Sequence, residues 1–370
     1  MFKIHARLLS LLTVFVLLAG CAAKAPTLNG QPFSANALKT LQSVQKVDTD
    51  FYVLDYYGDY GLDSLMKTGA KDESALAAFV SEKLLNGLDF PATSLKLACS
   101  SFAAKNPAGD YIQGRNMDFA LAQNILVRTR PANGHASLAM ASGALLNYMK
   151  SVPDGLQERA RLLAAPYYAV DGINDAGVSI AVLLQTGAEV LRQNTGKPSM
   201  TTTMAVRFVL DKAATVNEAI DVLRAYDMQG MTNANFHFLI VDAHGDRAVV
   251  EYVKNELRVI RSKGYGLPVT NFFLSKDVKE AYRDGEDRIK ILRAALNKNK
   301  GVVSEKQAWE MLESIKAVND MDENTGINFN TAYSMIFNNT KRAMDVCINA
   351  DFSKVFSYTV KGTFEKKAQQ

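Results

Sequence analysis

Short apolar runs separated by turn residues begin after Lys96 and alternate, in blocks, with segments of helical periodicity. The first block predicts a β-hairpin whose strands, CSSFAAK and YIQGRNMDF, are joined by a turn at 106–110. Further strands are expected over 124–142, 167–185 and 236–262 and in the last forty residues. Helices are expected at Thr202–Ala214, Val216–Tyr226, Asp284–Leu296 and Glu305–Ala317. This order of blocks predicts an α+β domain in which antiparallel sheets are covered by paired helices.

The N-terminus has the pattern of a secretion signal. Lys3 and Arg7 precede an apolar run, LLSLLTVFVLLA, that is shorter than the ~20 residues of a membrane-spanning helix. The run ends in Leu18-Ala19-Gly20-Cys21, which resembles the signal of bacterial lipoproteins, where the cysteine receives a lipid and becomes the new N-terminus. An ordinary secretory signal with a chance cysteine is the alternative. We therefore expect Cys21 to be lipidated and the protein to be anchored in the bacterial cell envelope, outside the cytoplasm.

Composition excludes several classes of function. Lys and Arg number 42 against 38 Asp and Glu, a formal net charge of +4, so a nucleic-acid partner is not expected. Three cysteines are too few for a disulfide scaffold, and Cys347 is expected to be a buried structural thiol. Four histidines without paired ligand spacing do not indicate a zinc site. No metal and no cofactor are expected.

The segment between the signal and the first hairpin is of mixed character. Apolar residues recur with helical spacing over 38–47 and again over 76–85. The tyrosine-rich stretch FYVLDYYGDYGLDSL at 51–65 is ambiguous between strand and helix. We expect a compact segment that precedes the layered domain.

Cys99 is the candidate nucleophile. It opens the first predicted strand, and the return strand brings Arg115 and Asp118 close to it. A neighbouring cation favours the thiolate, which is the nucleophilic form of cysteine. One alternative is that Cys99 packs in the sheet while Arg115 and Asp118 form a surface ion pair. A Cys–His dyad with His237 or His244 is another, although Cys99 lacks the Cys-Gly-Ser-Cys-Trp context of papain-like enzymes.

A series of motifs runs through the chain in order. Arg115 and Asp118, within Gly-Arg-Asn-x-Asp-Phe, follow Cys99 by 16 and 19 positions. The later motifs are DGINDAG at 171–177, FHF to VVE over 236–251, Val269-Thr270-Asn271 and Asp287-Arg288. Together they resemble the N-terminal-nucleophile (Ntn) cysteine hydrolases called linear amide C–N hydrolases. This family includes the choloylglycine (bile salt) hydrolases, the penicillin V acylases and the isopenicillin-N acyltransferase group.

The resemblance implies a four-layer αββα Ntn-hydrolase sandwich and a maturation step. In this family the cysteine is the first residue of the mature enzyme, and its α-amino group is the base for its own thiol. An α-amine has a pKa of about 7.7–8.0, close to working pH. Because Cys99 is internal, the bond from Ala98 must be cut, which we expect to be autocatalytic. The expected parts are a signal peptide at 1–20, a lipid-anchored pro-segment at 21–98 that covers the site, and a catalytic domain at 99–370.

The resemblance also implies roles for five residues. Cys99 would be nucleophile and, through its amine, base. Asp118 would accept a hydrogen bond from the α-ammonium group, and Arg115 would hold the thiolate and help to seat the substrate. Asn271 would donate its side-chain amide to the oxyanion, and Arg288 would brace the site electrostatically.

A second oxyanion donor has no clean counterpart in this chain. The family's second asparagine corresponds to the LLQ stretch at 183–185, so Gln185 is the candidate, with a backbone N–H as the alternative. The oxyanion hole is therefore only half assigned.

The activity implied is hydrolysis of a linear, non-peptide amide through a thioester acyl-enzyme, with water as acceptor. The substrate would be a small-molecule amide whose acyl group and amine the sequence does not specify. An acyltransferase that passes the acyl group to an amine is the first alternative. A non-catalytic lipoprotein that binds ligands with the same fold is the second. The oligomeric state stays open, a homo-oligomer included.

Overall fold

The computed structural model describes residues 26–91, 98–119, 121–185, 190–231, 234–262, 264–278, 283–322 and 327–362. The predicted signal peptide and Cys21 lie outside these ranges. None of the helices within them is long and apolar enough to cross a bilayer.

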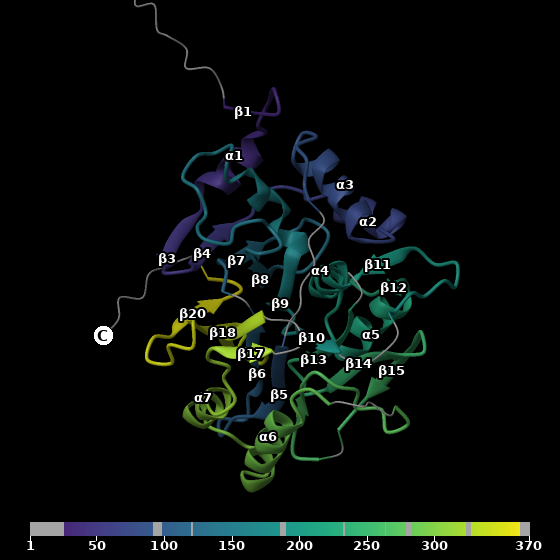
Figure 1. The fold of residues 1–370 in the computed structure, drawn as a ribbon, viewed down its shortest axis with the longest axis vertical. Helices are drawn as coiled ribbons and strands as arrows, with labels where there is room; N and C mark the ends of the chain where they lie inside the picture. The colour runs from purple at the N-terminus through teal and green to yellow at the C-terminus, as the bar shows by residue number, and fades with distance from the viewer. Residues whose placement is uncertain are drawn as a thin grey trace, which may run out of the picture.

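Two sheets form the middle of the molecule (Figure 1). The nine-stranded sheet runs, in spatial order, β15 (Glu256–Ile260), β14 (Arg247–Val253), β13 (Asn235–Val241), β10 (Ser179–Gln185), β9 (Ala169–Asn174), β8 (Ser137–Ser142), β7 (Asn124–Thr129), β4 (Phe51–Asp55) and β3 (Gln45–Asp48). The second sheet runs β16 (Leu267–Val269), β5 (Ala98–Lys105), β6 (Tyr111–Phe119), β18 (Ile327–Asn338), β19 (Ala343–Ile348) and β20 (Phe356–Thr359), and β17 (Asp320–Asp322) pairs with β18.

Helices cover the outer face of each sheet, which completes four layers. Helices α4 (Thr202–Lys212) and α5 (Val216–Arg224) and the 3-10 helix η1 (Ala160–Tyr168) pack on the nine-stranded sheet. Helices α6 (Glu286–Lys298) and α7 (Glu305–Glu313) pack on the second sheet, at the bottom of Figure 1. The smaller elements are β1 (Thr27–Leu28), β2 (Gln31–Pro32), α1 (Ala35–Gln42), α2 (Leu62–Thr68), α3 (Glu73–Leu84), β11 (Ser199–Thr201) and β12 (Asp227–Gln229). The predicted αββα sandwich is confirmed.

The helices form where the sequence predicts them because their starts are capped. Thr215 accepts a hydrogen bond from the Glu218 N–H at the start of α5. Ser304 and Gln307 form a reciprocal capping box at the start of α7. All four predicted helices are present, with ends displaced by a few residues.

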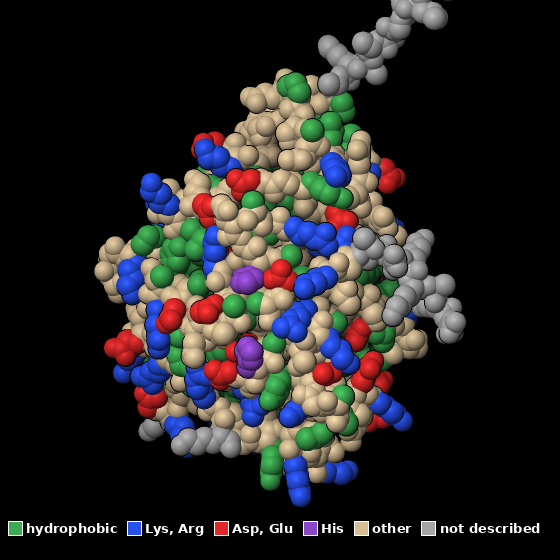
Figure 2. Space-filling view, turned by 180° about the vertical axis from the view of Figure 1, so that it is seen from behind, with side chains coloured by type: hydrophobic (Ala, Val, Ile, Leu, Met, Phe, Trp, Pro, Cys, Tyr) green, Lys and Arg blue, Asp and Glu red, His purple; other side chains and the backbone are tan. Residues whose placement is uncertain are grey.

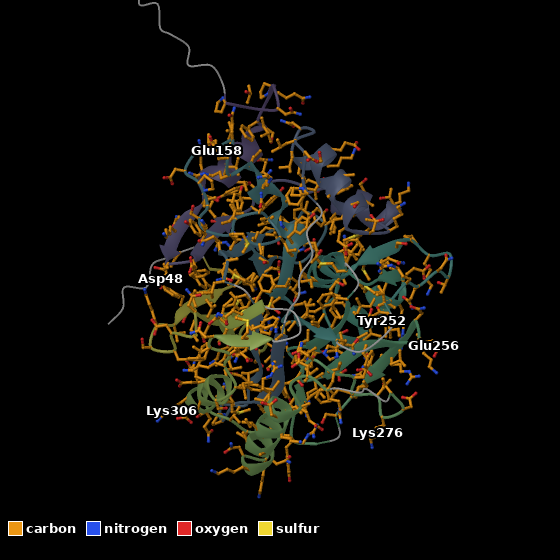
Figure 3. The ribbon with its side chains drawn as sticks, in the orientation of Figure 1. Asp48, Glu158, Tyr252, Glu256, Lys276 and Lys306 are labelled. Atoms are coloured by element: carbon orange, nitrogen blue, oxygen red, sulfur yellow. The ribbon has the colours of Figure 1, made fainter. Side chains whose placement is uncertain are left out.

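The prediction of a helix over 38–47 is only partly right. Helix α1 ends at Gln42, and 45–48 form the edge strand β3. The Ser43 hydroxyl accepts a hydrogen bond from the Asp55 N–H (3.0 Å) and so turns the chain back toward β4. Asp48, in β3, lies at the left edge of the molecule in Figure 3. The ambiguous stretch at 51–65 contains both structures, β4 and then the start of α2.

The described part of the predicted pro-segment is built into the nine-stranded sheet. Strand β4 pairs with β7, and it does so in parallel, unlike the other neighbours in the two large sheets. The Arg128 guanidinium donates to both Asp55 carboxylate oxygens (2.6 and 2.8 Å). Tyr60 reaches α4 and donates to the Asp211 carboxylate. Residues 26–91 are thus part of the layered fold, and their role as a pro-segment that covers the site stays a prediction.

Candidate active site

Strands β5 and β6 place Cys99 and Arg115 on one face of their hairpin. Cys99 lies opposite Met117, and Arg115 lies opposite Ser101. Gly114, which precedes Arg115 in β6, is required because a Cβ there would lie 2.3 Å from the ring of Phe102, its partner in register. The glycine of the Gly-Arg-Asn motif therefore serves the close packing of the hairpin.

The Cys99 thiol is sealed inside the molecule, between the two sheets. Its exposed fraction is 0%. The sulfur lies 3.8 Å from Met117 Sδ, and the Arg115 guanidinium lies beside it. Burial raises the pKa of the thiol, and Arg115 acts in the opposite direction by favouring the thiolate. Burial is the larger of the two effects, so the pKa of the thiol is raised.

Arg115 is held by an acid from the opposite sheet. Its Nε donates to Asp171 Oδ1 (2.9 Å), and its Nη2 donates to the carbonyl of Val182 (2.8 Å). Tyr333 donates its hydroxyl proton to the second oxygen of Asp171. The side chains of Arg115 and Asp171 are both fully buried. This geometry excludes a surface pair between Arg115 and Asp118.

Asp118 lies on the opposite face of the hairpin from the thiol. It is opposite Ala98 in register, and its carboxylate accepts a hydrogen bond from Thr331 (2.6 Å). Arg288 on α6 lies 3.5 Å from its other oxygen. Burial raises the pKa of Asp118, and Arg288 and Thr331 oppose that effect. Asp118 therefore stands beside the residue whose peptide bond would be cut, and not beside the sulfur.

Asn271 and Arg288 hold the backbone of Cys99 from both sides. The Cys99 N–H donates to Asn271 Oδ1 (2.7 Å), and Arg288 donates to the Cys99 carbonyl (2.9 Å). Arg288 also donates to Asn271 Oδ1 (3.0 Å). Gly285, with a φ of 77°, precedes α6, and a Cβ there would lie 2.7 Å from Arg288 Nη2. The left-handed turn before α6 thus leaves room for Arg288.

The Asn271 amide already has one acceptor in the uncut chain. Its Nδ2 donates to the carbonyl of Leu184 (2.9 Å). With Oδ1 turned to the Cys99 N–H, these two partners fix the orientation of the side chain. That Asn271 donates to an oxyanion stays a prediction.

The structure brings Gln185 close to the site but not to the sulfur. Its Nε2 lies 3.5 Å from Glu251 Oε2, and its Oε1 has no hydrogen-bond partner among the described residues. His237 bonds through Nε2 to the Thr270 carbonyl (2.7 Å), and the exposed His244 lies in the turn between β13 and β14. The Cys–His dyad is therefore excluded, and Gln185 as an oxyanion donor stays a prediction.

Sequence reasoning missed three residues of the site: Asp171, Met117 and Tyr333. Asp171 was visible only as the first residue of the DGINDAG motif, with no role attached.

No group of three or more potential metal ligands occurs within the described ranges. Two surface cavities, one along α3 and one beside Arg128, are lined by none of the predicted site residues.

Residues 99–271, which include the hairpin and Asn271, match the family model for linear amide C–N hydrolases, choloylglycine hydrolase family. This match confirms the family resemblance. The linear amide C–N hydrolase region covers Cys99, Arg115, Asp118 and Asn271, and Arg288 lies beyond it.

Individual relatives agree with the family match. A penicillin V acylase from Pectobacterium atrosepticum is 26% identical over 193 residues, 47% of this chain and 49% of that protein. The chain thus spans about half the length of this curated relative. A mutant conjugated bile acid hydrolase from Clostridium perfringens has a TM-score of 0.52 at 18% identity, covering 70% of this chain and 92% of that one. Penicillin V acylase from Agrobacterium tumefaciens has a TM-score of 0.50 at 15% identity, covering 70% and 86%. These solved structures show the Ntn-hydrolase fold.

Proposed function

We propose that this protein hydrolyses a linear, non-peptide amide of a small molecule, with Cys99 as nucleophile. The observation that carries the proposal is the buried thiol beside the Arg115–Asp171 pair, within the region that matches the family. The thiolate attacks the amide carbonyl, the amine leaves with a proton, and a thioester acyl-enzyme forms. Water then hydrolyses the thioester and restores the thiol.

The uncut chain lacks the base that this mechanism needs. The Cys99 nitrogen is an amide whose N–H donates to Asn271, and an amide nitrogen does not accept a proton at neutral pH. We propose that the thiol first attacks the Ala98 carbonyl, which moves the acyl group from nitrogen to sulfur. Water hydrolyses the resulting thioester, which leaves a carboxylate on Ala98 and both a free amine and a free thiol on Cys99. That amine, with an unperturbed pKa of about 7.7–8.0, then becomes the base.

The surrounding residues support specific roles in the cut enzyme. Asp118 is in register with Ala98 and would accept a hydrogen bond from the new ammonium group. Arg115 would stabilise the thiolate, and Arg288 would hold the Cys99 carbonyl. Asn271, with Gln185 as the second candidate, would donate to the oxyanion, a contribution of about 3–4 kcal/mol for one donor.

N-terminal sequencing and intact-mass measurement of the purified protein test the proposal. Wild type is expected to yield a chain that begins at Cys99, and Cys99→Ala is expected to stay uncut. A protein that keeps Ala98 joined to Cys99 and still hydrolyses amides would contradict the mechanism. Product analysis with and without an added amine separates hydrolysis from acyl transfer.

We also propose that the protein is a lipoprotein of the bacterial cell envelope, lipidated on Cys21, whose pro-segment stays bound after cleavage. Three contacts support retention: the pairing of β4 with β7, the Asp55–Arg128 ion pair and the Tyr60–Asp211 hydrogen bond. Fully buried side chains such as Phe51 and Leu54 add roughly 1.5–3 kcal/mol each. Membrane fractionation after confirmed cleavage is expected to find the catalytic chain with the membrane. A wholly soluble catalytic chain would contradict retention.

A further inference from the structure

Three buried polar side chains lie together beside the candidate site, and two of them, His237 and Glu251, have no part in the mechanism above. Gln185 on β10, His237 on β13 and Glu251 on β14, here called the Glu251 cluster, are 3%, 0% and 0% exposed. Their strands are neighbours in the nine-stranded sheet. Burying a carboxylate costs free energy unless hydrogen bonds compensate for the lost water. The hydrogen-bond partners of Glu251 therefore indicate which part of the structure it stabilises.

Glu251 binds the backbone of the segment that follows Asn271. Its Oε2 accepts a hydrogen bond from the Leu274 N–H (3.0 Å), and its Oε1 accepts one from the Ser275 N–H (2.9 Å). In Figure 3, Tyr252 and Lys276, which directly follow Glu251 and Ser275, lie on the same side of the molecule. The carboxylate thus ties two consecutive N–H groups to β14.

His237 binds the residue that precedes Asn271. A carbonyl can only accept, so His237 Nε2 carries the proton that it donates to the Thr270 carbonyl (2.7 Å). Its other nitrogen lies 3.8 Å from Glu251 Oε2. The cluster therefore holds the chain immediately before Asn271 and three to four residues after it.

Asn271 connects this anchored segment to Cys99. Its Oδ1 accepts the Cys99 N–H, and its Nδ2 donates to the carbonyl of Leu184, the neighbour of Gln185. Burial acts to raise the pKa of Glu251, but His237 and the N–H groups of Leu274 and Ser275 outweigh it, so the pKa is lowered and the acid stays ionised. A shift of the anchored segment would move the amide of Asn271 relative to the Cys99 nitrogen.

We propose that Glu251 is a positioning residue, which fixes the segment that carries Asn271 and thereby accelerates both the release of Cys99 and amide turnover. The proposal rests on the proposed function for its catalytic part. Misplacing a catalytic group by about 1 Å can cost on the order of 100-fold in rate.

Glu251→Gln in the full chain is the test, and Asp242→Asn is its matched control. Asp242 is also a buried carboxylate of the same hairpin, at the turn end, and accepts backbone N–H groups of Val216, His244 and Asp246. Glu251→Gln is expected to lower kcat by about 10- to 100-fold with a smaller change in KM. It is also expected to slow cleavage before Cys99, whereas Asp242→Asn leaves both rates close to wild type.

Hydrogen exchange of the peptide around 270–278 provides a readout that does not depend on activity. Faster exchange is expected in Glu251→Gln and not in Asp242→Asn, because only the first variant weakens the acceptor of two amides in this peptide. If Glu251→Gln does not fold, Glu251→Asp keeps the charge and shortens the side chain, and an intermediate loss of kcat is expected.

Two results would overturn the proposal: equal losses of kcat in the Glu251 and Asp242 variants, or faster exchange at 270–278 with unchanged rates of cleavage and turnover. If wild type hydrolyses no linear amide, the proposed function fails instead. Glu251 is then judged on the rate of cleavage before Cys99 and on hydrogen exchange alone.

Discussion

Cys99 and Cys347 are both fully buried cysteines of the second sheet, but their surroundings differ. Cys99, on β5, points between the sheets and has the Arg115 guanidinium beside it. Cys347, on β19, lies opposite Ser334 and has no such cation: burial raises its pKa to about 11. Burial raises the pKa of both thiols, so what distinguishes the candidate nucleophile is the guanidinium beside it on the same face of the hairpin.

The largest expected effect separates the two cysteines directly. Cys99→Ala is expected to lower amide hydrolysis by on the order of 1000-fold or more, because the nucleophile is lost. Cys347→Ala is expected to keep its activity and lose only the stability that a small cavity costs. Steady-state kinetics of both variants at equal concentration measures this. Comparable losses of amide hydrolysis in the two variants would contradict the assignment of Cys99 as the nucleophile.

The second prediction concerns the acid that holds Arg115. Asp171→Asn leaves a fully buried guanidinium without its counter-charge and is expected to lower the free energy of unfolding by about 3–5 kcal/mol. Asp277→Asn breaks another Arg–Asp pair, Arg258–Asp277, which is exposed to solvent, and a far smaller loss is expected. Urea denaturation of the uncut chains, each in a Cys99→Ala background, measures both. A small loss for Asp171→Asn would show that the buried pair is unimportant for the fold.

Tyr333→Phe tests the hydrogen bond from the Tyr333 hydroxyl to Asp171, the acid that holds Arg115. The variant removes the hydroxyl that donates to Asp171 and is expected to cost about 1.5–3 kcal/mol, since the acceptor is charged. The benzene ring stays, so packing in the sheet is unchanged. The same urea titration is the measurement, and an unchanged midpoint would mean that Asp171 is satisfied by Arg115 alone.

The smallest expected effect is a pH dependence that belongs to Cys347. Its pKa is raised in the folded state, so its contribution to stability is complete below the unfolded pKa near 9 and is lost as pH rises toward about 11. At pH 10 the loss is about 1 kcal/mol relative to Cys347→Ala. Stability curves of wild type and Cys347→Ala between pH 8 and 10.5 should therefore converge as pH rises, and parallel curves would contradict the raised pKa.

Surface charge agrees with the composition. Figure 2 shows Lys and Arg side chains interleaved with Asp and Glu over the face that it draws, in line with a formal net charge of +4. The expected absence of a nucleic-acid partner rested on this near balance.

One feature of the site could have been refined from the sequence. Arg115 and Asp118 were expected close to Cys99, and because they are three positions apart in a strand, whose side chains alternate between faces, they approach it from opposite faces. The alternation of side chains along the strand therefore places them on opposite faces: Arg115 contacts Asp171 of the other sheet, and Asp118 contacts Arg288 of α6.

The sequence by itself determined the hairpin of Cys99, the capped helices and the α+β class, and the αββα layering was implied by the resemblance to the family. These features are encoded within about twenty consecutive residues, through apolar periodicity, turn chemistry and caps. Only the tertiary structure decided that Asp171 holds Arg115, that β4 joins the nine-stranded sheet in parallel and that Glu251 anchors the segment of Asn271. Each of these contacts joins residues from separate elements, and local sequence does not specify which strands and loops become neighbours when the layers close.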